Sequence, residues 1–361
     1  MISKFKIFVL IILISQCFHQ ANGCSSFCIT DNNNIILGKS FEWHLGFGYV
    51  MTNHRNISKT RYLPYDETPV VWTSKYGSVT FNLYGREYPV GGMNETGLVV
   101  EALQYDETEY PAPDKRPALD EIGWVQYQLD NSATIYDVID SEKKIRISDK
   151  TRAKIHFLIT DQNGNTLIVE FLNRKATYYY NDDLPQKCLT NDTYNNSLKF
   201  LNKHIGFGGE TPINYQYQNH SPLGRFAVIA DMINSYKTEN NIPIIDYSFD
   251  ILGKVKNKKK TQFQIVYDIK QKKIYFRTLK SKQIKSVDLL SFNFDCASEQ
   301  MMIDVNTSIK GDISNSFIPY DLKKNKKQIK KAYKKGRIKL SNNILIELAE
   351  WPSRLKCADY N

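Results

Sequence analysis

The 361-residue sequence has little of several features that would place it in a special class of protein. Its 6 cysteines are too few for a small domain held together by many disulfides. Its 18 glycines and 12 prolines are near average use, which excludes collagen-like and low-complexity chains. Internal repeats and long linkers are also missing. We therefore expect a folded chain whose length suits one large domain or two ordinary ones.

The sequence also lacks an apolar run long enough to span a membrane. Residues 1–23 begin with two lysines ahead of the apolar run Ile7–Ile14 and end in Ala21-Asn22-Gly23. That run is shorter than the roughly 20 residues that a spanning helix needs. A basic start, a short apolar middle and small residues at the end are typical of a signal peptide, with an uncleaved anchor or a core helix as the alternatives. We predict cleavage between Gly23 and Cys24, and a secreted, periplasmic or secretory-lumen location.

Cleavage would remove Cys17 and leave an odd number of cysteines. In an oxidising compartment an odd count suggests that one thiol stays free while others pair. Cys24 is our candidate for the free thiol. The other four are available for pairing, in an order that the sequence does not determine: Cys28, Cys188, Cys296 and Cys357.

Positive charge exceeds negative charge, with a formal net charge of +10, and it is concentrated in two runs, Lys254–Lys260 and Lys323–Lys339. Binding to nucleic acid would favour aromatic side chains on which bases stack, yet only Tyr333 interrupts the longer run. A solvated surface that is weakly attracted to anionic surfaces is the better interpretation. We therefore expect both runs on the surface and no nucleic-acid partner.

The sequence patterns predict mainly strands, interrupted by helices. The 23 tyrosines and 18 phenylalanines favour sheet, and Asn163-Gly164 is a strong hairpin signal. The expected strands are Ser26–Thr30, Ile35–Phe41, Val70–Ser74, Ser78–Tyr84, Leu98–Leu103, Ile155–Thr160, Thr166–Phe171, Ala176–Tyr180, Phe263–Tyr267 and Lys273–Arg277. The expected helices are Ile122–Asp130, Ile135–Ser141, Tyr194–Leu201 and Pro222–Ile233. This order predicts one α+β domain with stacked sheets.

A cysteine at a processed N-terminus can carry two catalytic roles. Its thiol is a strong nucleophile, and a free α-amino group, with a pKa of about 7.7 to 8.0, can act as the base. The alternatives are a disulfide or a lipid anchor. A lipid anchor normally follows leucine three residues upstream of the cysteine, where this chain has Ala21.

Five short motifs follow one another along the chain: Cys24-Ser25-Ser26-Phe27, Gly38-Lys39-Ser40-Phe41-Glu42-Trp43, Gly92-Met93-Asn94-Glu95-Thr96-Gly97-Leu98, Leu189-Thr190-Asn191 and Arg225-Phe226. In order and approximate spacing they resemble the choloylglycine hydrolase family, and the resemblance covers nearly the whole chain after residue 23. That family contains penicillin V acylases and conjugated bile salt hydrolases, and belongs to the N-terminal-nucleophile hydrolases. The resemblance implies a single catalytic domain over residues 24–361, built as a four-layer αββα sandwich of two antiparallel sheets.

The resemblance also implies hydrolysis of linear C–N amide bonds of a small-molecule N-acyl substrate, through an acyl-cysteine intermediate and without a metal or organic cofactor. Penicillin V, bile salt conjugates, acyl-homoserine lactones and N-acyl amino acids or lipids are all candidate substrates. The sequence does not determine whether the protein forms a homo-oligomer. A secreted binding protein that keeps the fold without turnover is the alternative function.

By position, the resemblance makes Cys24 the nucleophile. Glu42 stands where the family has the aspartate that holds the α-amino group, and Lys39 stands where many members have arginine. Both replacements keep the charge, but lysine lacks the planar fork of arginine. A cation such as Lys39 close to Cys24 would lower the pKa of its thiol from about 8.5.

Three further residues match site positions of the family. Asn191 corresponds to the side chain of the oxyanion hole, and Gln104 to the residue whose backbone N–H completes that hole. Arg225 corresponds to an active-site arginine, a second cation that could lower the pKa of the thiol. Each site residue also has an ordinary alternative: Lys39 and Glu42 as strand charges, Asn191 as a helix N-cap, Arg225 in a surface ion pair.

Other kinds of site find little support. Cys24 and Cys28 lack the motif of papain-like proteases and the spacing of metal ligands. The five histidines outside the predicted signal peptide lie in no motif, and we expect structural roles for them: His44, His54, His156, His204 and His220. Glycosylation sequons begin at Asn56, Asn94, Asn191, Asn195, Asn219 and Asn306. A glycosylated Asn191 could not donate to an oxyanion.

Overall fold

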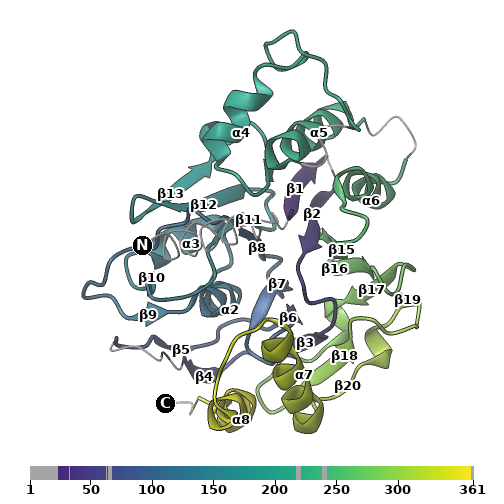
Figure 1. Ribbon diagram of the computed structural model, residues 1–361. Helices are drawn as coiled ribbons and strands as arrows, with labels where there is room; N and C mark the ends of the chain where they lie inside the picture. Colours follow the sequence, from purple (N-terminus) through teal and green to yellow (C-terminus); the bar gives the residue numbers. More distant parts are fainter. Residues whose placement is uncertain are drawn as a thin grey trace, which may run out of the picture.

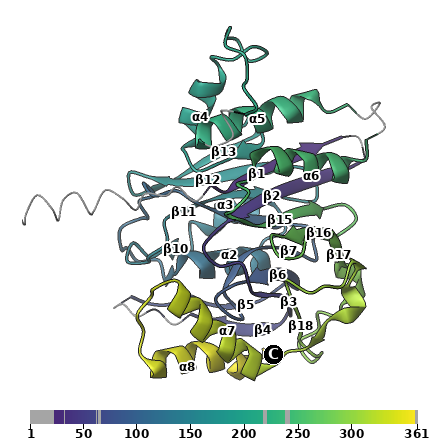
Figure 2. The same ribbon diagram turned by 45° about the vertical axis from the view of Figure 1, so that its right-hand side comes forward.

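A computed structural model describes residues 23–31, 33–61, 63, 67–216, 221–237 and 242–358. Residues 1–22 of the predicted signal peptide lie outside the described residues, as do Asn219 and His220. The chain forms two large sheets with helices on their outer faces (Figures 1 and 2). None of the helices within these ranges is both long and apolar enough to cross a membrane.

The first sheet contains the start of the described chain. Its strand order is β14 (Cys188–Leu189), β1 (Ser25–Thr30), β2 (Ile35–Glu42), β15 (Thr261–Asp268), β16 (Lys273–Thr278), β17 (Lys285–Asp288) and β19 (Gly311–Asp312). All neighbours are antiparallel except β17 and β19. The predicted strands near the start of the chain and the late pair Phe263–Tyr267 and Lys273–Arg277 are confirmed as neighbours in this sheet.

The second sheet is antiparallel throughout. Its order is β13 (Lys175–Tyr180), β12 (Thr166–Leu172), β11 (Ile155–Thr160), β8 (Val99–Gln104), β7 (Pro89–Asn94), β6 (Ser78–Asn82), β3 (Tyr49–Asn53), β18 (Met301–Asp304) and β20 (Ile318–Pro319). Two small sheets pair β9 (Ala118–Leu119) with β10 (Arg146–Ile147), and β4 (Ile57–Thr60) with β5 (Val71–Thr73) and β21 (Lys356–Cys357).

Helices cover the outer face of each sheet. α4 (Tyr194–Leu201), α5 (Pro222–Ser235) and α6 (Ile244–Val255) lie on the side of the first sheet, and α2 (Glu121–Asn131) and α3 (Ile135–Ser141) on the side of the second (Figure 1). α7 (Leu322–Lys335) and α8 (Asn342–Glu350) pack together at the C-terminal end. The short 3₁₀ helices are Asn181–Asp183, Leu289–Ser291, Ser314–Ser316 and Trp351–Arg354.

The alternation of β11 shows how the layers are held together. Leu158 packs into the core between the two sheets, whereas Phe157 and Ile159 pack into a second core beneath α2 and α3. A strand that is buried on both faces reads as a continuous apolar run because successive side chains point to opposite faces. The predicted αββα sandwich is therefore the observed fold.

Several elements differ from the sequence prediction. β3, β4 and β7 were not expected, and β7 is a poor strand by composition because it contains Gly91 and Gly92. A Cβ at Gly92 would lie 2.6 Å from the backbone carbonyl oxygen of Val79 on the neighbouring strand, so close packing favours glycine there. The unpredicted helix α6 buries Ile244, Phe249 and other side chains at helical spacing.

The longer basic run forms helix α7, a conformation that we did not predict. Its lysines are exposed, as expected, except for Lys326, whose half-buried ammonium lies 2.6 Å from Glu350 Oε1. The opposite side buries Ile329 and Ala332. Lysine is a good helix former, so a lysine-rich segment with one apolar stripe can fold as a surface helix.

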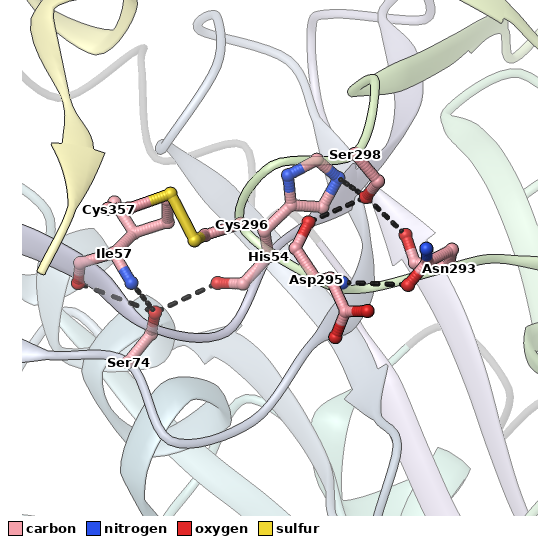
Figure 3. Close-up of a disulfide and its surroundings, with 8 residues drawn as sticks. All are labelled: His54, Ile57, Ser74, Asn293, Asp295, Cys296, Ser298 and Cys357. Atoms are coloured by element: carbon pink, nitrogen blue, oxygen red, sulfur yellow. Dashed lines mark hydrogen bonds between the residues drawn. A yellow bond between two sulfur atoms is a disulfide. The ribbon is translucent and has the colours of Figure 1, made fainter. Parts of the chain in front are cut away.

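A single disulfide among the described residues joins Cys296 to Cys357, with 5.5 Å between their Cα atoms (Figure 3). It connects the loop before β18 to β21 across 61 residues of sequence, and loop-closure entropy gives it a stabilisation of about 4 kcal/mol.

His54 lies beside this disulfide (Figure 3). Burial lowers the pKa of His54 to about 4, with help from the charges of Arg86 and Lys59. His54 is therefore neutral at neutral pH, in keeping with a structural role.

The expectation that four cysteines pair is wrong for two of them. Cys28 and Cys188 are free and buried, and Cys24 is free, as predicted. Cys188 lies opposite Phe27 in the register of β14 and β1. Because successive side chains of a strand point to opposite faces, Cys28 faces away from Cys188 and the two thiols cannot meet.

Candidate active site

The start of β1 and the end of β2 bring Cys24 next to Glu42. The two strands form an antiparallel hairpin in which Ser25 lies opposite Ser40, so the residue before β1 lies beside the last residues of β2. The Cys24 side chain is only 3% exposed, and its Sγ lies 3.8 Å from the carbonyl oxygen of Glu42. The hairpin thus fixes the thiol at the edge of the interface between the two sheets.

The Glu42 carboxylate is buried and held from two sides. Its Oε2 accepts a hydrogen bond of 3.1 Å from the backbone N–H of Gly23. Its Oε1 accepts from the Thr261 hydroxyl at 2.7 Å and from the backbone N–H of Asn257 at 3.2 Å. Thr261 and Asn257 were not identified from the sequence, because only the pairing of β15 with β2 brings them to Glu42.

Arg225 lies in the first turn of α5, where Pro222 occupies the first position and Ser221 caps the helix by accepting from the Gly224 N–H. Its Nη1 donates to the carbonyl oxygens of Gly23 and Cys24, the latter at 3.0 Å. Burial lowers the pKa of Arg225 although the nearby charges of Glu42 and Cys24 oppose the shift, and the guanidinium stays charged at neutral pH. The alternative of a surface ion pair is wrong, because Arg225 is 2% exposed.

Asn191 connects Arg225 to the second sheet. Its Oδ1 accepts a hydrogen bond of 2.9 Å from Arg225 Nη2, and its Nδ2 donates to the carbonyl oxygen of Gln104 at 2.6 Å. An amide nitrogen carries two hydrogens, and the bond to Gln104 uses one of them. The alternative of a helix N-cap is wrong, since Thr193 caps α4.

Gln104 presents its backbone to the site. Its side chain donates to Asp106 Oδ1 at 2.5 Å, while its carbonyl oxygen accepts from Asn191. Within a strand, the N–H and C=O of one residue point to the same side. The Gln104 N–H therefore points to the side on which Asn191 lies, which is the arrangement that two oxyanion donors need.

Lys39 is the one predicted site residue whose contacts lead elsewhere. Its Nζ donates to the Ala102 carbonyl oxygen at 2.5 Å and lies 3.7 Å from Glu101 Oε2. Both side chains are fully buried between the sheets, so Lys39 is not an ordinary surface charge of a strand. No contact found among the described residues joins Lys39 to Cys24, which leaves Arg225 as the cation in contact with the Cys24 backbone. The Lys39 ammonium uses its donors on Ala102 and Glu101, and it lacks the planar fork with which arginine binds two oxygens side by side.

Glu101 gives this buried pair a pH dependence. Burial raises its pKa to about 7, and the Lys39 charge and the hydrogen bond of 2.5 Å from the Tyr267 hydroxyl only partly oppose the shift. A carboxyl group whose pKa is higher in the folded state favours folding below its ordinary value of about 4.5. This contribution is lost as the pH rises through 7.

We therefore expect Glu101→Gln to remove a stability loss on the order of 3 kcal/mol that the wild type shows between pH 4.5 and 7.5. Urea unfolding at both pH values measures it. Glu109→Gln, at an exposed carboxylate, is the matched control and should keep the wild-type slope. Identical slopes for wild type and Glu101→Gln would contradict the assignment.

The geometry agrees with comparisons to known proteins. A sequence model of the linear amide C–N hydrolases, choloylglycine hydrolase family, matches residues 24–302. The chain belongs to this family. Among choloylglycine hydrolase family relatives, a penicillin V acylase from Pectobacterium atrosepticum is 25% identical over 291 residues, which cover 69% of this chain and 77% of the relative.

Solved structures of the choloylglycine hydrolase family share the fold. A penicillin V acylase from Agrobacterium tumefaciens superposes with a TM-score of 0.69 at 23% identity, covering 82% of this chain and 98% of the other. A conjugated bile acid hydrolase from Clostridium perfringens gives 0.65 at 20% identity, covering 80% and 98%. The predictions of family, of fold and of a hydrolase acting on linear amide bonds are confirmed. The matched residues end before α7, α8 and the disulfide partner Cys357.

Proposed function

We propose that this chain is a secreted cysteine amidohydrolase that cleaves the linear C–N amide bond of a small N-acyl substrate. Cys24 is the nucleophile and its α-amino group, freed by removal of residues 1–23, is the base. The observation that carries the proposal is that the Glu42 carboxylate and the Arg225 guanidinium both bind the backbone at Gly23 and Cys24, with the Asn191 amide bonded to that guanidinium. The match of the family at Cys24 as its first residue supports it.

The proposed reaction has two halves. The Cys24 thiol attacks the amide carbonyl carbon while the α-amino group accepts the thiol proton. The oxyanion that forms receives hydrogen bonds from Asn191 Nδ2 and the Gln104 N–H. The C–N bond then breaks, the ammonium gives its proton to the leaving amine, and the acyl group stays on sulfur. Water attacks this thioester with the α-amino group again as base, and the carboxylic acid and the thiol are released.

Glu42 and Arg225 have electrostatic roles in this proposal. Glu42 holds the α-amino group, since its carboxylate already binds the backbone nitrogen of the preceding residue, Gly23. Arg225 places positive charge next to Cys24 and holds its backbone by donating to its carbonyl oxygen at 3.0 Å. The glutamate side chain is longer than the aspartate that the family has at this position, and from the end of β2 it can reach the α-amino nitrogen of Cys24.

Detection of an acyl-enzyme separates this function from the alternative of a binding protein without turnover. Processed protein is mixed with one compound from each candidate class, quenched in acid and analysed by mass spectrometry. An amidase should show the Cys24 peptide heavier by the acyl group for at least one class. A binding protein would retain the ligand without any covalent adduct.

Secretion is the part of the proposal that rests on the sequence of residues 1–23 and on the disulfide. Disulfides persist mainly in oxidising compartments, so the Cys296–Cys357 bond supports export. N-terminal sequencing of protein recovered from the culture medium or the secretory lumen should begin at Cys24. A chain that is retained in the cytosol and starts at Met1 would contradict export.

Replacement of Asn191 by alanine is expected to lower kcat by about 10² to 10³, with a smaller effect on KM, because its donor acts on charge that develops in the transition state. Asn195→Ala, at an exposed position of α4, is the control and should keep wild-type kcat. Mass analysis should find Asn191 unglycosylated. An unchanged kcat in folded Asn191→Ala would remove it from the oxyanion hole.

A further inference from the structure

Next to the proposed oxyanion hole, the second sheet buries a histidine and a glutamate as cross-strand neighbours. Phe157 of β11 lies opposite Val169 of β12, so the next pair in the ladder is His156 and Glu170. His156 Nδ1 lies 3.4 Å from Glu170 Oε1, and both side chains are fully buried. Neither residue has a role in the proposed reaction.

Glu170 contacts the segment that carries Asn191. Its Oε1 accepts a hydrogen bond of 2.9 Å from the backbone N–H of Tyr194, the first residue of α4. A negative charge at the N-terminus of a helix is favourable because the backbone N–H groups there have no partner within the helix. Asn191 lies three residues before Tyr194, so this bond fixes the start of α4 and the short segment that leads to Asn191.

His156 contacts the segment that carries Gln104. Its ring stacks on the Tyr105 ring, with 5.3 Å between centroids and an angle of 19° between the planes. The Tyr105 N–H donates to the carbonyl oxygen of Lys154 at 2.9 Å, which extends the ladder of β8 and β11 by one residue. The stack therefore keeps Tyr105 in the extended conformation that continues β8. This also fixes the backbone of Gln104, the residue before it.

The Glu170–Tyr194 bond holds the segment next to Asn191, and the His156–Tyr105 stack holds the residue next to Gln104. Asn191 and Gln104 are themselves joined by the hydrogen bond from Asn191 Nδ2 to Gln104 O. We propose that His156 and Glu170 are positioning residues that set the separation and orientation of the two oxyanion donors. The proposal rests on the proposed function of Asn191 and Gln104. It extends that function to a buried pair that touches neither the substrate nor Cys24.

The cost of burying this pair supports a role beyond stability. His156 Nε2 has no hydrogen-bond partner in the part of the chain that the structure describes. Burial of a polar atom without a hydrogen-bond partner is unfavourable for folding. Apolar side chains of similar volume would often serve stability as well or better. The presence of His156 and Glu170 here is explained by the backbone at Tyr105 and Tyr194 that they hold in place.

The test uses the processed, full-length protein and compares two substitutions of Glu170. Glu170→Leu removes the acceptor for Tyr194 and should lower kcat about tenfold, with KM within about threefold, because the start of α4 that leads to Asn191 is no longer held in place. Glu170→Gln keeps an oxygen acceptor and should stay within about threefold of the wild type. Val138→Ala, in the core beneath α3, is the control for a general loss of stability and should leave kcat unchanged.

A double-mutant comparison shows whether Glu170 acts through Asn191. Once Asn191 is alanine, Glu170→Leu should have almost no further effect on kcat, because the group that it positions is gone. A tenfold effect that persists in the Asn191→Ala background would overturn the positioning role and leave the proposed function intact. An unchanged kcat in Asn191→Ala alone would overturn the oxyanion hole and this inference together. If Glu170→Leu fails to fold, Tyr105→Leu, which removes the stack on His156, tests the other contact: it should lower kcat about tenfold with KM within about threefold, and an unchanged kcat would overturn the positioning role.

Discussion

Cys24→Ala is expected to abolish amide hydrolysis and acyl-enzyme formation while leaving the unfolding midpoint within a few degrees of the wild type. The loss should be complete because the acyl group is held on the Cys24 sulfur, and the Ser25 and Thr261 hydroxyls that contact Arg225 and Glu42 are much weaker nucleophiles than a thiol. Stability should change little because the substitution removes one sulfur atom at the first residue of the processed chain. Initial rates with the best substrate, mass spectrometry and a thermal melt measure the three quantities.

The matched control is Cys28→Ala, four residues further along the chain in β1. Burial raises the pKa of the Cys28 thiol, which keeps it protonated and unreactive at neutral pH. Cys28→Ala should therefore retain full activity. Turnover in pure Cys24→Ala, or its loss in folded Cys28→Ala, would assign the chemistry to another thiol.

Retention of a single residue ahead of Cys24 is expected to have an equally large effect. A folded protein that begins at Gly23 should be inactive, because the Cys24 nitrogen is then an amide and cannot accept the thiol proton. The structure, which includes Gly23, shows the contacts that this residue makes. Its N–H donates to Glu42, and its carbonyl oxygen accepts from Arg225. Glu42 would thus hold Gly23 instead of the α-amino group of Cys24.

Trimming of Gly23 with an aminopeptidase should restore turnover in the same sample, which is its internal control. The activity of the trimmed protein should then depend on a group that titrates near neutral pH or modestly above it, as an α-amino group does. Full activity in a form whose sequencing still reads Gly23-Cys24 after the assay would exclude the α-amino group as the base.

The parts of the fold that the sequence predicted correctly depend on neighbours along the chain. The Asn163-Gly164 signal placed the β11–β12 hairpin correctly, and Gly164 has the positive φ of 81° that such a turn requires. α3 also begins and ends where its pattern indicated, because Thr134 and Asp137 form a capping box at its start. In both cases the residues that set the boundary lie within a few positions of it.

The site residues were predicted by resemblance, but their partners were not. Arg225 and Gly23 are 202 residues apart in sequence, and their contact arises only when α5 packs on the start of β1. Likewise, Lys39 was expected near the thiol, whereas the packing of the two sheets places Glu101 of β8 against it. His156 was expected to be merely structural, since the sequence gives no sign that Tyr105 and Glu170 would flank it.

The disulfide between Cys296 and Cys357 has a consequence for proteolysis. A protease that cuts once between these residues, for example in the exposed lysine-rich part of α7, leaves two fragments that remain covalently joined. The nicked protein should run as one band on a non-reducing gel and as two after reduction. Because Cys24 and the other proposed site residues all precede Cys296, a nicked molecule keeps every group of the proposed reaction on one fragment.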